Sequence, residues 1–551
     1  MNTIRALKWW IALPVAALGG LSLDAATPWL NWWPAGLIGA ALVIASVWQQ
    51  RSLAGLLLGA VAGAAFWGPH ISWLTLYLGP IPWLALCFVM VSWFALFGLV
   101  ASTATRALSQ LQLPGAARVT LQALTVAGLW VLREQLQSTV PYGGFAWGRL
   151  AHTQAEGPFS ELVSWVGFAG FSGILALMCA ALVATAFAWR GRPAIVPGIP
   201  GGIASGSRAW LGAAACVITL GALTLVPPAQ LEVTGALRVG AVQGNSKSGI
   251  FDDRESGDVL RDHLEATEAL LDELEAAGEN VDVIVWPENS AEFDLPGNPY
   301  GSYAVQRLAK RAEAPIVVGT ILRDPDGTYT NSTLVFDDAG DTGERYDKRR
   351  PVPFAEYMPD REFYRSLVPD LIDLVQLDYA FGSRPTVLPI DGTSGPLDAG
   401  IAICFDIIFD DHAAAMVGDG AEVIFAQTNN ADFGRTDESA QQLQIARLRA
   451  IETGRSLVNI STVGTSAVVM PDGRDLMRLE TFTADAMVAE VPLVQGETPA
   501  LRLGAFIAGT WIAIAVGGTL LGLFGGFLPG YGARQRSSGD SGDSATLAPV
   551  A

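Results

Sequence analysis

The pattern of apolar and polar positions divides this chain into two kinds of sequence. Long apolar runs follow one another up to about residue 227, and one more lies near the C-terminus. Apolar runs of about 17–25 residues are long enough to cross a bilayer as helices. We therefore predict eight membrane spans, near residues 9–23, 29–48, 53–72, 80–103, 118–133, 160–189, 209–227 and 503–527.

Residues 228–502 follow a different pattern. Short runs rich in β-branched residues alternate with stretches of helical periodicity, which is typical of an α/β layered fold. The predicted strands are 238–243, 281–286, 315–322, 330–336, 399–404, 423–427, 457–461 and 467–470. The predicted helices are about 254–277, 300–313, 409–417 and 437–453.

These patterns predict four parts of the chain. A membrane domain with seven spans covers 1–227, an α/β domain covers 228–502, a last span covers 503–530, and a polar, disordered tail covers 531–551. Basic residues before the first apolar run are also compatible with a signal peptide. Seven further spans favour an uncleaved first helix instead.

The basic residues at the span ends predict the orientation in the membrane. They all fall on one side of an eight-span arrangement: Arg5, Lys8, Arg51, Arg106, Arg118, Arg190, Arg192, Arg208, Arg534 and Arg536. Lys and Arg accumulate in cytoplasmic loops. Both termini are therefore expected in the cytoplasm, with the 228–502 domain on the opposite side of the membrane.

Charge is segregated along the 551 residues. The formal net charge is −19, yet the only acids before residue 228 are Asp24, Glu134, Glu156 and Glu161. An acidic α/β domain argues against nucleic acid as a partner. Spans with almost no internal charge disfavour a transporter. The α/β domain has no Cys/His cluster for zinc, and neither a metal nor an organic cofactor is expected.

Three residues near predicted strand ends could form a nucleophilic site. Cys404 is the only cysteine between residues 228 and 502, and α/β folds bind ligands beyond the carboxyl ends of strands. Glu288 could take the thiol proton, and Lys348 could stabilise a developing oxyanion. No histidine lies beside these motifs, which disfavours a Cys-His pair.

In this order, the three motifs resemble the nitrilase superfamily with its Glu-Lys-Cys triad. They read Trp286-Pro-Glu288-Asn-Ser, Tyr346-Asp-Lys348-Arg-Arg-Pro-Val-Pro353 and Ile403-Cys404-Phe-Asp406. With seven predicted spans before this domain and one after it, the chain resembles the apolipoprotein N-acyltransferase family over roughly residues 5–530. The resemblance implies a multi-span helical membrane domain that carries a four-layer αββα sandwich.

The resemblance also implies a role for each matching residue. Glu288 is carried over as general base, Lys348 as oxyanion stabiliser and Cys404 as nucleophile. Glu356, eight residues after Lys348, is carried over as a second essential acid. The other candidates are Asp406 and Phe405 beside the nucleophile, and Trp147, Gln243, Asn245 and Asn429 as substrate-binding residues.

Two motifs depart from the family pattern. The family usually has Tyr-Glu after its cysteine, where this chain has Phe405-Asp406. The family's Asn-Asp-Ala-Trp-Phe run appears here as Asn429-Asn430-Ala431-Asp432-Phe433. Both departures leave the triad intact, and both bear on how substrate is contacted.

The implied activity is the final step of lipoprotein maturation in a bacterial cytoplasmic membrane. A phospholipid would donate a fatty acyl chain, through a Cys404 thioester, to the amino group of an N-terminal diacylglyceryl-cysteine, and we expect a monomer. The aromatic, Gly-rich segment 141–149 is either an ordinary loop or part of a lipid-facing cleft. Residues 363–380 are either a membrane-touching lid or a packed helix. Two alternatives to the activity stay open: a membrane-anchored nitrilase-type amidase, and a non-catalytic scaffold with a degenerate nitrilase fold.

Overall fold

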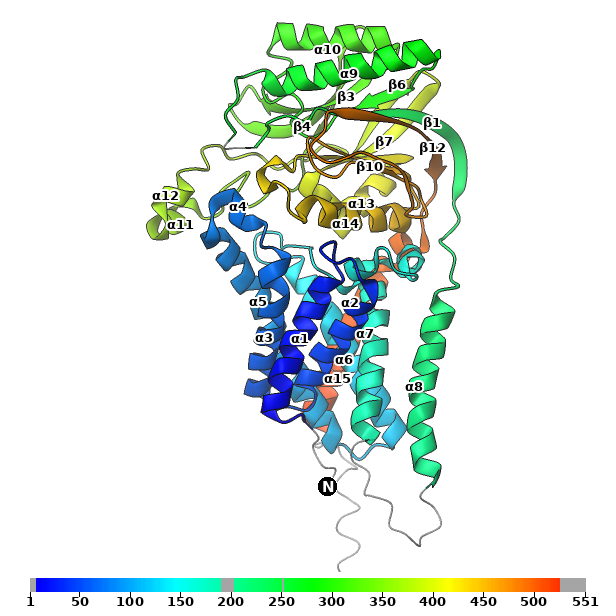
Figure 1. The fold of residues 1–551 in the computed structure, drawn as a ribbon. Helices are drawn as coiled ribbons and strands as arrows, with labels where there is room; N and C mark the ends of the chain where they lie inside the picture. The colour runs from blue at the N-terminus through cyan, green and yellow to red at the C-terminus, as the bar shows by residue number, and fades with distance from the viewer. Residues whose placement is uncertain (1–5, 190–202, 250–251, 526–551) are drawn as a thin grey trace, which may run out of the picture.

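The computed structural model describes residues 6–189, 203–249 and 252–525. A helical bundle carries an α/β domain on one of its ends (Figure 1). The predicted tail at 531–551 lies outside the described residues, and so do five of the basic residues that set the predicted orientation: Arg5, Arg190, Arg192, Arg534 and Arg536.

The bundle is built from the apolar runs of the sequence. Its long helices each fall on a predicted span: α1 (Trp9–Ala25), α2 (Trp33–Val47), α3 (Ser52–His70), α5 (Pro80–Gln110), α6 (Gly115–Gln137), α7 (Val163–Trp189), α8 (Ile203–Leu223) and α15 (Pro499–Phe524). The short helix α4 (Leu74–Leu78) connects α3 to α5. Two 3₁₀ turns, η1 (Leu150–Gln154) and η2 (Ser160–Leu162), precede α7.

Five helices of the described chain are long and apolar enough to cross a membrane. They are α3, α5, α6, the stretch Ser160–Ala188 that covers all but the last residue of α7, and α15. The apolar helices α1 and α2 have 17 and 15 residues, and the searched part of α8, Ala214–Leu223, is also short. At about 1.5 Å per residue, α1 and α2 fall short of a hydrocarbon core of about 30 Å. The structure thus supports a membrane protein, while the count of eight spans stays a prediction.

The α/β domain contains two six-stranded sheets. One has the order β12-β1-β2-β3-β4-β5, and the other has the order β11-β10-β9-β8-β7-β6. The strands are β1 (Glu232–Gln243), β2 (Val283–Val285), β3 (Ile316–Arg323), β4 (Tyr329–Asp337), β5 (Gly340–Asp347), β6 (Val387–Gly392), β7 (Gly395–Ile403), β8 (Val423–Thr428), β9 (Leu457–Ser461), β10 (Ala467–Val469), β11 (Asp475–Arg478) and β12 (Asp485–Gln495). The pairs β1–β2, β2–β3, β7–β8 and β8–β9 are parallel.

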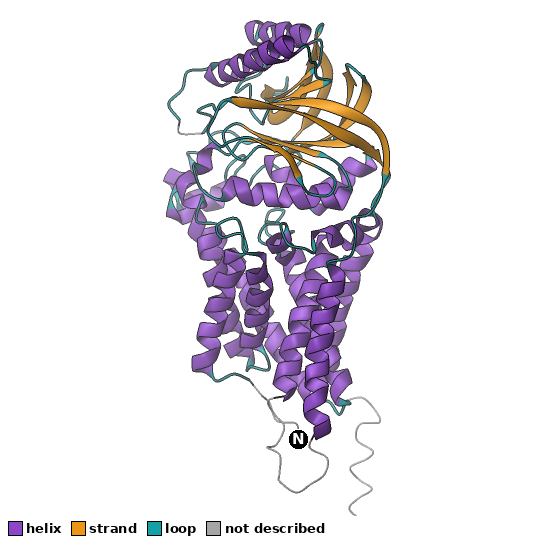
Figure 2. Ribbon diagram, turned by 45° about the vertical axis from the view of Figure 1, so that its right-hand side comes forward, coloured by secondary structure: helices purple, strands orange, loops and turns teal. Residues whose placement is uncertain are grey.

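Helices cover the outer faces of both sheets (Figure 2). The helices α9 (Asp258–Ala277) and α10 (Pro299–Ala312) share an apolar core with the first sheet, through side chains such as Leu270, Leu308 and Val318. A second core, with Val239 and Phe425, lies between the sheets. The helices α13 (Asp410–Gly418) and α14 (Glu438–Thr453) lie on the second sheet. Four layers result, as the resemblance implied.

The eight predicted strands are the eight interior strands, and the four that were not predicted are the four edges. Those edges are β5, β6, β11 and β12. Edge strands are half exposed and carry charged residues and prolines, here Pro389 in β6 and Pro492 in β12. They therefore lack the continuous apolar run that marks a central strand.

The helix α14 joins the α/β domain to the bundle. Fourteen of its sixteen residues are buried, polar ones included. One continuous apolar core contains Leu443 and Ile451 of α14, Ile424 of β8 and Trp147 of the bundle. A polar side chain of α14 binds the bundle as well: Gln441 accepts hydrogen bonds from the indoles of Trp73 and Trp147 at 3.2 and 2.8 Å. The two parts therefore share a core at this interface.

Candidate active site

Glu288 lies in a tight turn after β2. Gly319 of β3 makes room for this turn, because a β-carbon there would lie 2.3 Å from the carbonyl oxygen of Pro287. The Glu288 side chain is only 4% exposed. One of its oxygens accepts from the Lys348 ammonium at 2.9 Å, and the other accepts from the backbone N–H of Asn429 at 2.8 Å.

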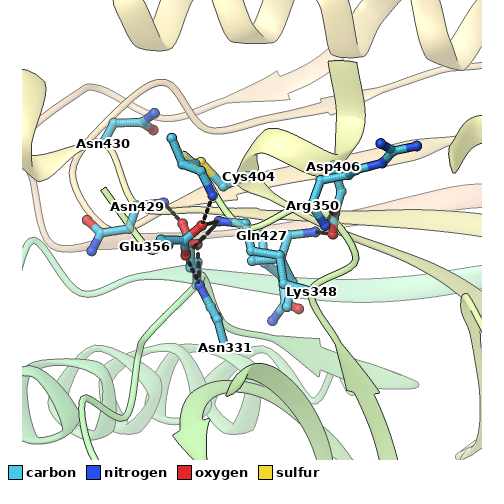
Figure 3. Close-up of polar contacts among 12 residues, drawn as sticks. Asn331, Lys348, Arg350, Glu356, Cys404, Asp406, Gln427, Asn429 and Asn430 are labelled. Atoms are coloured by element: carbon cyan, nitrogen blue, oxygen red, sulfur yellow. Dashed lines mark hydrogen bonds and ion pairs between the residues drawn. The ribbon is translucent and has the colours of Figure 1, made fainter. Parts of the chain in front are cut away.

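Lys348 directly follows the edge strand β5 and is almost completely buried. Its ammonium lies between two carboxylates, at 2.9 Å from Glu288 Oε1 and 2.9 Å from Glu356 Oε2. The backbone N–H of Val352 donates to Glu356 at 2.7 Å and fixes this second acid. The structure therefore brings together three of the predicted residues in one buried cluster (Figure 3).

Asn331 of β4 belongs to this cluster, although the sequence analysis missed it. Its Nδ2 donates to Glu288 Oε1 at 2.7 Å and to Glu356 Oε1 at 2.9 Å, so one amide bridges both acids. The sequence contained a signal for this residue, because the predicted strand 330–336 begins with four consecutive polar residues, Thr330, Asn331, Ser332 and Thr333. The structure shows that all four are buried.

Cys404 begins the 3₁₀ turn η3 (Cys404–Ile408) directly after β7. Its φ of 48° lies in the left-handed region that non-glycine residues rarely adopt. Such backbone strain is found at functional sites, where it aims a side chain away from its strand. The residue as a whole is partly exposed, and its sulfur accepts a hydrogen bond from Gln442 Nε2 at 3.5 Å. Among the described residues, it has no hydrogen bond to Glu288 or Lys348.

Burial and neighbouring charges shift the pKa of each group. Burial raises the pKa of Glu288; Lys348 opposes this shift and Glu356 adds to it. Burial alone would lower the pKa of Lys348, but the two carboxylates hold it well above its usual range. Burial raises the pKa of the Cys404 thiol, Glu288 raises it further, and Lys348 acts in the opposite direction. These shifts favour a neutral thiol, a protonated Lys348 and a Glu288 carboxylate of increased basicity.

The two residues after Cys404 face different parts of the structure. Asp406 is fully buried and accepts from Tyr346 OH at 2.7 Å and from the backbone N–H of Arg350 at 2.8 Å. It therefore ties the turn that carries Cys404 to the segment that carries Lys348, to one side of the carboxylate cluster (Figure 3). Phe405 points toward the bundle, where its ring stacks with that of Phe145 at 6.3 Å between centroids.

The segment 141–149 and Trp147 lie under the α/β domain. Trp147 is 3% exposed, stacks on Phe145 with centroids 5.6 Å apart, and donates to Gln441 of α14. Arg149 pairs with Asp410 of α13 at 2.8 Å. Most of this segment therefore packs against the α/β domain in this conformation.

The other predicted substrate-binding residues surround the site at different distances. Asn429 contacts Glu288 through its backbone, and its side-chain oxygen accepts from Ser248 and Thr462, both at 2.9 Å. Gln243 is fully buried, and its amide bonds to the backbone carbonyls of residues 480 and 483. Asn245 is exposed and lines a pocket of about 490 Å³ beside α9. Neither Glu288 nor Glu356 lines this pocket, so it is separate from the cluster around Lys348.

The predicted lid consists of two short helices, α11 (Arg361–Leu367) and α12 (Pro369–Ile372), beside α4 (Figure 1). Ile372 and Val375 are buried in a small core of their own, whereas Phe363 and Leu367 are 60% and 63% exposed. The backbone N–H of Tyr379 donates to the carbonyl of Glu356 at 2.8 Å, which connects this segment directly to the site.

Comparisons with known proteins agree with this architecture. The family model for the apolipoprotein N-acyltransferase N-terminal domain matches residues 19–181, and the carbon-nitrogen hydrolase model matches residues 238–498. The apolipoprotein N-acyltransferase of Mycolicibacterium smegmatis is 32% identical over 547 residues, which cover 94% of this chain and 86% of that protein. The chain belongs to the apolipoprotein N-acyltransferase family.

Further members of the family align over almost their whole length. The Azotobacter vinelandii protein is 27% identical over 95% of this chain and 97% of its own, and the Vibrio cholerae protein is 25% identical over 94% and 98%. The carbon-nitrogen hydrolase of Helicobacter pylori G27 covers 50% of this chain and 93% of its own at 19% identity, with a TM-score of 0.34, too low to support a conclusion. Both halves of the chain thus carry the family's domains, in the family's order.

Proposed function

We propose that this chain transfers a fatty acyl chain from a membrane phospholipid to the α-amino group of the N-terminal diacylglyceryl-cysteine of apolipoproteins. Membership of the apolipoprotein N-acyltransferase family supports this reaction. The observation that carries the mechanism is the strained thiol of Cys404 beside a buried cluster in which Lys348 lies between Glu288 and Glu356. Such a set can perform acyl transfer without a cofactor.

In the first half of the reaction, Cys404 becomes acylated. Glu288, whose pKa is raised by burial, takes the thiol proton, and the thiolate attacks the ester carbonyl of the phospholipid. Lys348 and nearby backbone N–H groups stabilise the oxyanion. The ester C–O bond then breaks, Glu288 returns its proton to the leaving alkoxide, and a lysophospholipid departs. A thioester remains on Cys404.

In the second half, the acceptor amine attacks the thioester. Glu288 takes a proton from the amine, the C–S bond breaks, and the thiolate of Cys404 regains that proton. Lys348 stays protonated throughout, because the two carboxylates hold its pKa well above its usual range. Glu356 keeps the ammonium in place and takes no proton in either half.

The thioester must be protected from water before the amine arrives. The segment with α11 and α12 is suited to this role, because its end contacts Glu356 and four of its exposed side chains are large and apolar. Leu374 and Leu377 are 48% and 41% exposed, in addition to Phe363 and Leu367. Exposed apolar side chains beside the end of a membrane bundle favour a lid that touches lipid over an ordinary packed helix.

We further propose the orientation that the basic residues predict. The described N-terminal end and the far end of α15 both lie at the end of the bundle opposite the α/β domain (Figure 1). Arg51 directly precedes α3, and Arg106 lies in the last part of α5. Both are in regions that we assign to the cytoplasmic side. Both termini then lie in the bacterial cytoplasm, and residues 228–502 lie outside it, with residues 503–530 as the last of eight spans.

Intact-mass spectrometry of the purified protein after incubation with phospholipid tests the proposal. Wild type is expected to gain the mass of one acyl chain, Cys404→Ala is expected to gain none, and Cys216→Ala, as matched control, is expected to behave as wild type. A diacylglyceryl-cysteine peptide should discharge the adduct and appear as the N-acylated product.

The same experiment separates the two alternatives. A membrane-anchored amidase would discharge its adduct to water at the same rate with or without the peptide amine. A non-catalytic scaffold would form no adduct on folded wild-type protein, and Cys404→Ala would still support its function in cells. Either result would refute the proposed transfer.

A further inference from the structure

A second buried polar network reaches Cys404 from α14. Gln442 Nε2 donates to the sulfur at 3.5 Å, and Gln442 Oε1 accepts from Asn430 Nδ2 at 3.0 Å. Asn430 Nδ2 also donates to Glu438 Oε2 at 2.8 Å. Glu438 is 4% exposed, and the acyl-transfer steps described above do not use it. A buried carboxyl that is connected to a nucleophile by two amides needs a reason to be there.

The orientation of both amides is determined by their surroundings. Asn430 Oδ1 accepts from the hydroxyl of Ser461 at 2.6 Å and from that of Thr428 at 3.0 Å, so its Nδ2 must face Glu438. Gly464 closes this side, because a β-carbon there would lie 2.4 Å from Asn430 Oδ1. Gln442 must then present its oxygen to Asn430 and its N–H to the sulfur.

The charge of Glu438 acts on the same thiol. Burial raises the pKa of Glu438 to about 8; the bond from Asn430 lowers it and Glu288 raises it. Glu438 is therefore mostly neutral at pH 7, and once it ionises it raises the pKa of Cys404. The other charged groups that act on Cys404 are Glu288 and Lys348. Asp437, the residue before Glu438, interacts with Asp24 and His70 of the bundle instead.

We propose that Glu438 is a positioning residue for the nucleophile: through Asn430 and Gln442 it aims an N–H donor at the sulfur of Cys404, and while it stays protonated it lets the thiolate form beside it. This proposal rests on Cys404 being the nucleophile of the proposed function. The thiolate is then stabilised from two sides, by Lys348 and by the amide of Gln442.

Alkylation of Cys404 by iodoacetamide between pH 6 and pH 10 measures this effect without any lipid. Peptide-level mass spectrometry separates Cys404 from Cys87, Cys179 and Cys216. Ionisation of Glu438 near pH 8 should hold back the rise of the wild-type rate above that pH. Glu438→Gln keeps an acceptor for Asn430 but cannot ionise, so its thiol pKa should fall by about one unit, which corresponds to about tenfold more thiolate at pH 9.

Two further variants complete the test. Gln442→Leu removes the donor at the sulfur, and its Cys404 should alkylate about tenfold more slowly at pH 7. Asp437→Asn, a neighbouring acid on the other face, should follow the wild-type profile. Glu438→Ala would leave Asn430 without its buried partner, so the near-isosteric Glu438→Gln and Gln442→Leu carry the test, each with its thermal midpoint compared with wild type.

The outcomes separate this proposal from the proposed function. Superimposable profiles for wild type, Glu438→Gln and Asp437→Asn would overturn the role of Glu438, even if the acyl adduct forms. The expected shift of alkylation without any acyl adduct would support the network and refute the transferase. A Gln442→Leu rate equal to that of wild type would overturn the donor to sulfur.

Discussion

Replacing Asn331 by Leu should move the acidic limb of the acylation rate to higher pH. Asn331 donates to Glu288 at 2.7 Å and to Glu356 at 2.9 Å, and its bond lowers the pKa of Glu288. A hydrogen bond to a charged group contributes about 1.5–3 kcal/mol. One pKa unit corresponds to about 1.4 kcal/mol, so losing this bond should raise the pKa of Glu288 by roughly one to two units.

The direction of this change follows from the proposed role of Glu288 as general base. Only its ionised form can take the thiol proton, so raising its pKa lowers the rate below the new pKa and leaves the rate well above it nearly unchanged. Leu has the branched shape and the number of side-chain heavy atoms of Asn, and it removes Asn331 Oδ1, a buried acceptor without a partner among the described residues. The fold should therefore tolerate this change better than Asn331→Asp, which would place a third carboxylate at one ammonium.

The assay is the rate of acyl-adduct formation on Cys404 between pH 5 and pH 9, followed by rapid quench and intact mass. Ser332→Ala is the matched control, because Ser332 is a buried neighbour on β4 that donates to Asp347 instead, at 2.6 Å. An acidic limb for Asn331→Leu within about 0.3 units of wild type would refute the claim that Asn331 sets the basicity of Glu288.

Three further predictions concern residues outside the carboxylate cluster. Asp406→Asn places an amide N–H against one of the two donors, Tyr346 OH or the backbone N–H of Arg350, which should cost about 1–3 kcal/mol and slow acylation at least about fivefold. Exposed Asp411→Asn should leave the rate unchanged, and equal rates for both variants would contradict the positioning role of Asp406. Arg449→Met leaves the buried Glu452 carboxylate without its arginine and Asp410 with one arginine fewer, and should destabilise the protein by about 3–5 kcal/mol in detergent at pH 7. Arg149 and Arg449 hold the pKa of Asp410 below its usual range. The stabilisation by these ion pairs is therefore present above the usual carboxyl pKa and is lost as the pH falls through the lowered pKa of Asp410. If the destabilisation by Arg449→Met stayed the same in acid, the pairing would be contradicted. Trp147→Phe should cost only about 1 kcal/mol, because Gln441 keeps the donor from Trp73, and slowed acylation at unchanged stability would make Trp147 a substrate contact instead.

The interior of the fold could be predicted from the sequence because burial on both faces leaves a continuous apolar run. The edge strand β5 has no such run, since it reads Gly-Asp-Thr-Gly-Glu-Arg-Tyr-Asp and only its last two residues are buried. Lys348 follows this strand directly, so its position in space depends on a strand that periodicity does not reveal. The resemblance placed Lys348 in one triad with Glu288, but the contact between their side chains was not predicted.

The partners of the predicted residues were harder to find than the residues themselves. Asn331, Asn430 and Gln442 are amides, and amides are also common on solvated surfaces. The helix α14 reads as a mostly polar helix, with Gln, Arg and Glu spread around its axis. Its polar side chains are buried because the bundle and the turn η3 supply partners for them, among them Glu156 for Arg447 at 2.9 Å. The sequence pattern shows that these positions are polar, but it cannot tell water from a second protein surface.

The burial of α14 fixes the position of the Cys404 sulfur relative to the helical bundle. Cys404 hydrogen-bonds to Gln442 of this helix, and Arg449 of the same helix holds the carbonyls of Ile407 and Ile408 in the turn η3. A movement of the α/β domain toward the membrane would disrupt the apolar core that this domain shares with the bundle. The sulfur of Cys404 therefore keeps its position, and the ester bond of the phospholipid has to reach it. The distance between the headgroup and the ester bond of a phospholipid then becomes a property by which such an enzyme can select its acyl donors.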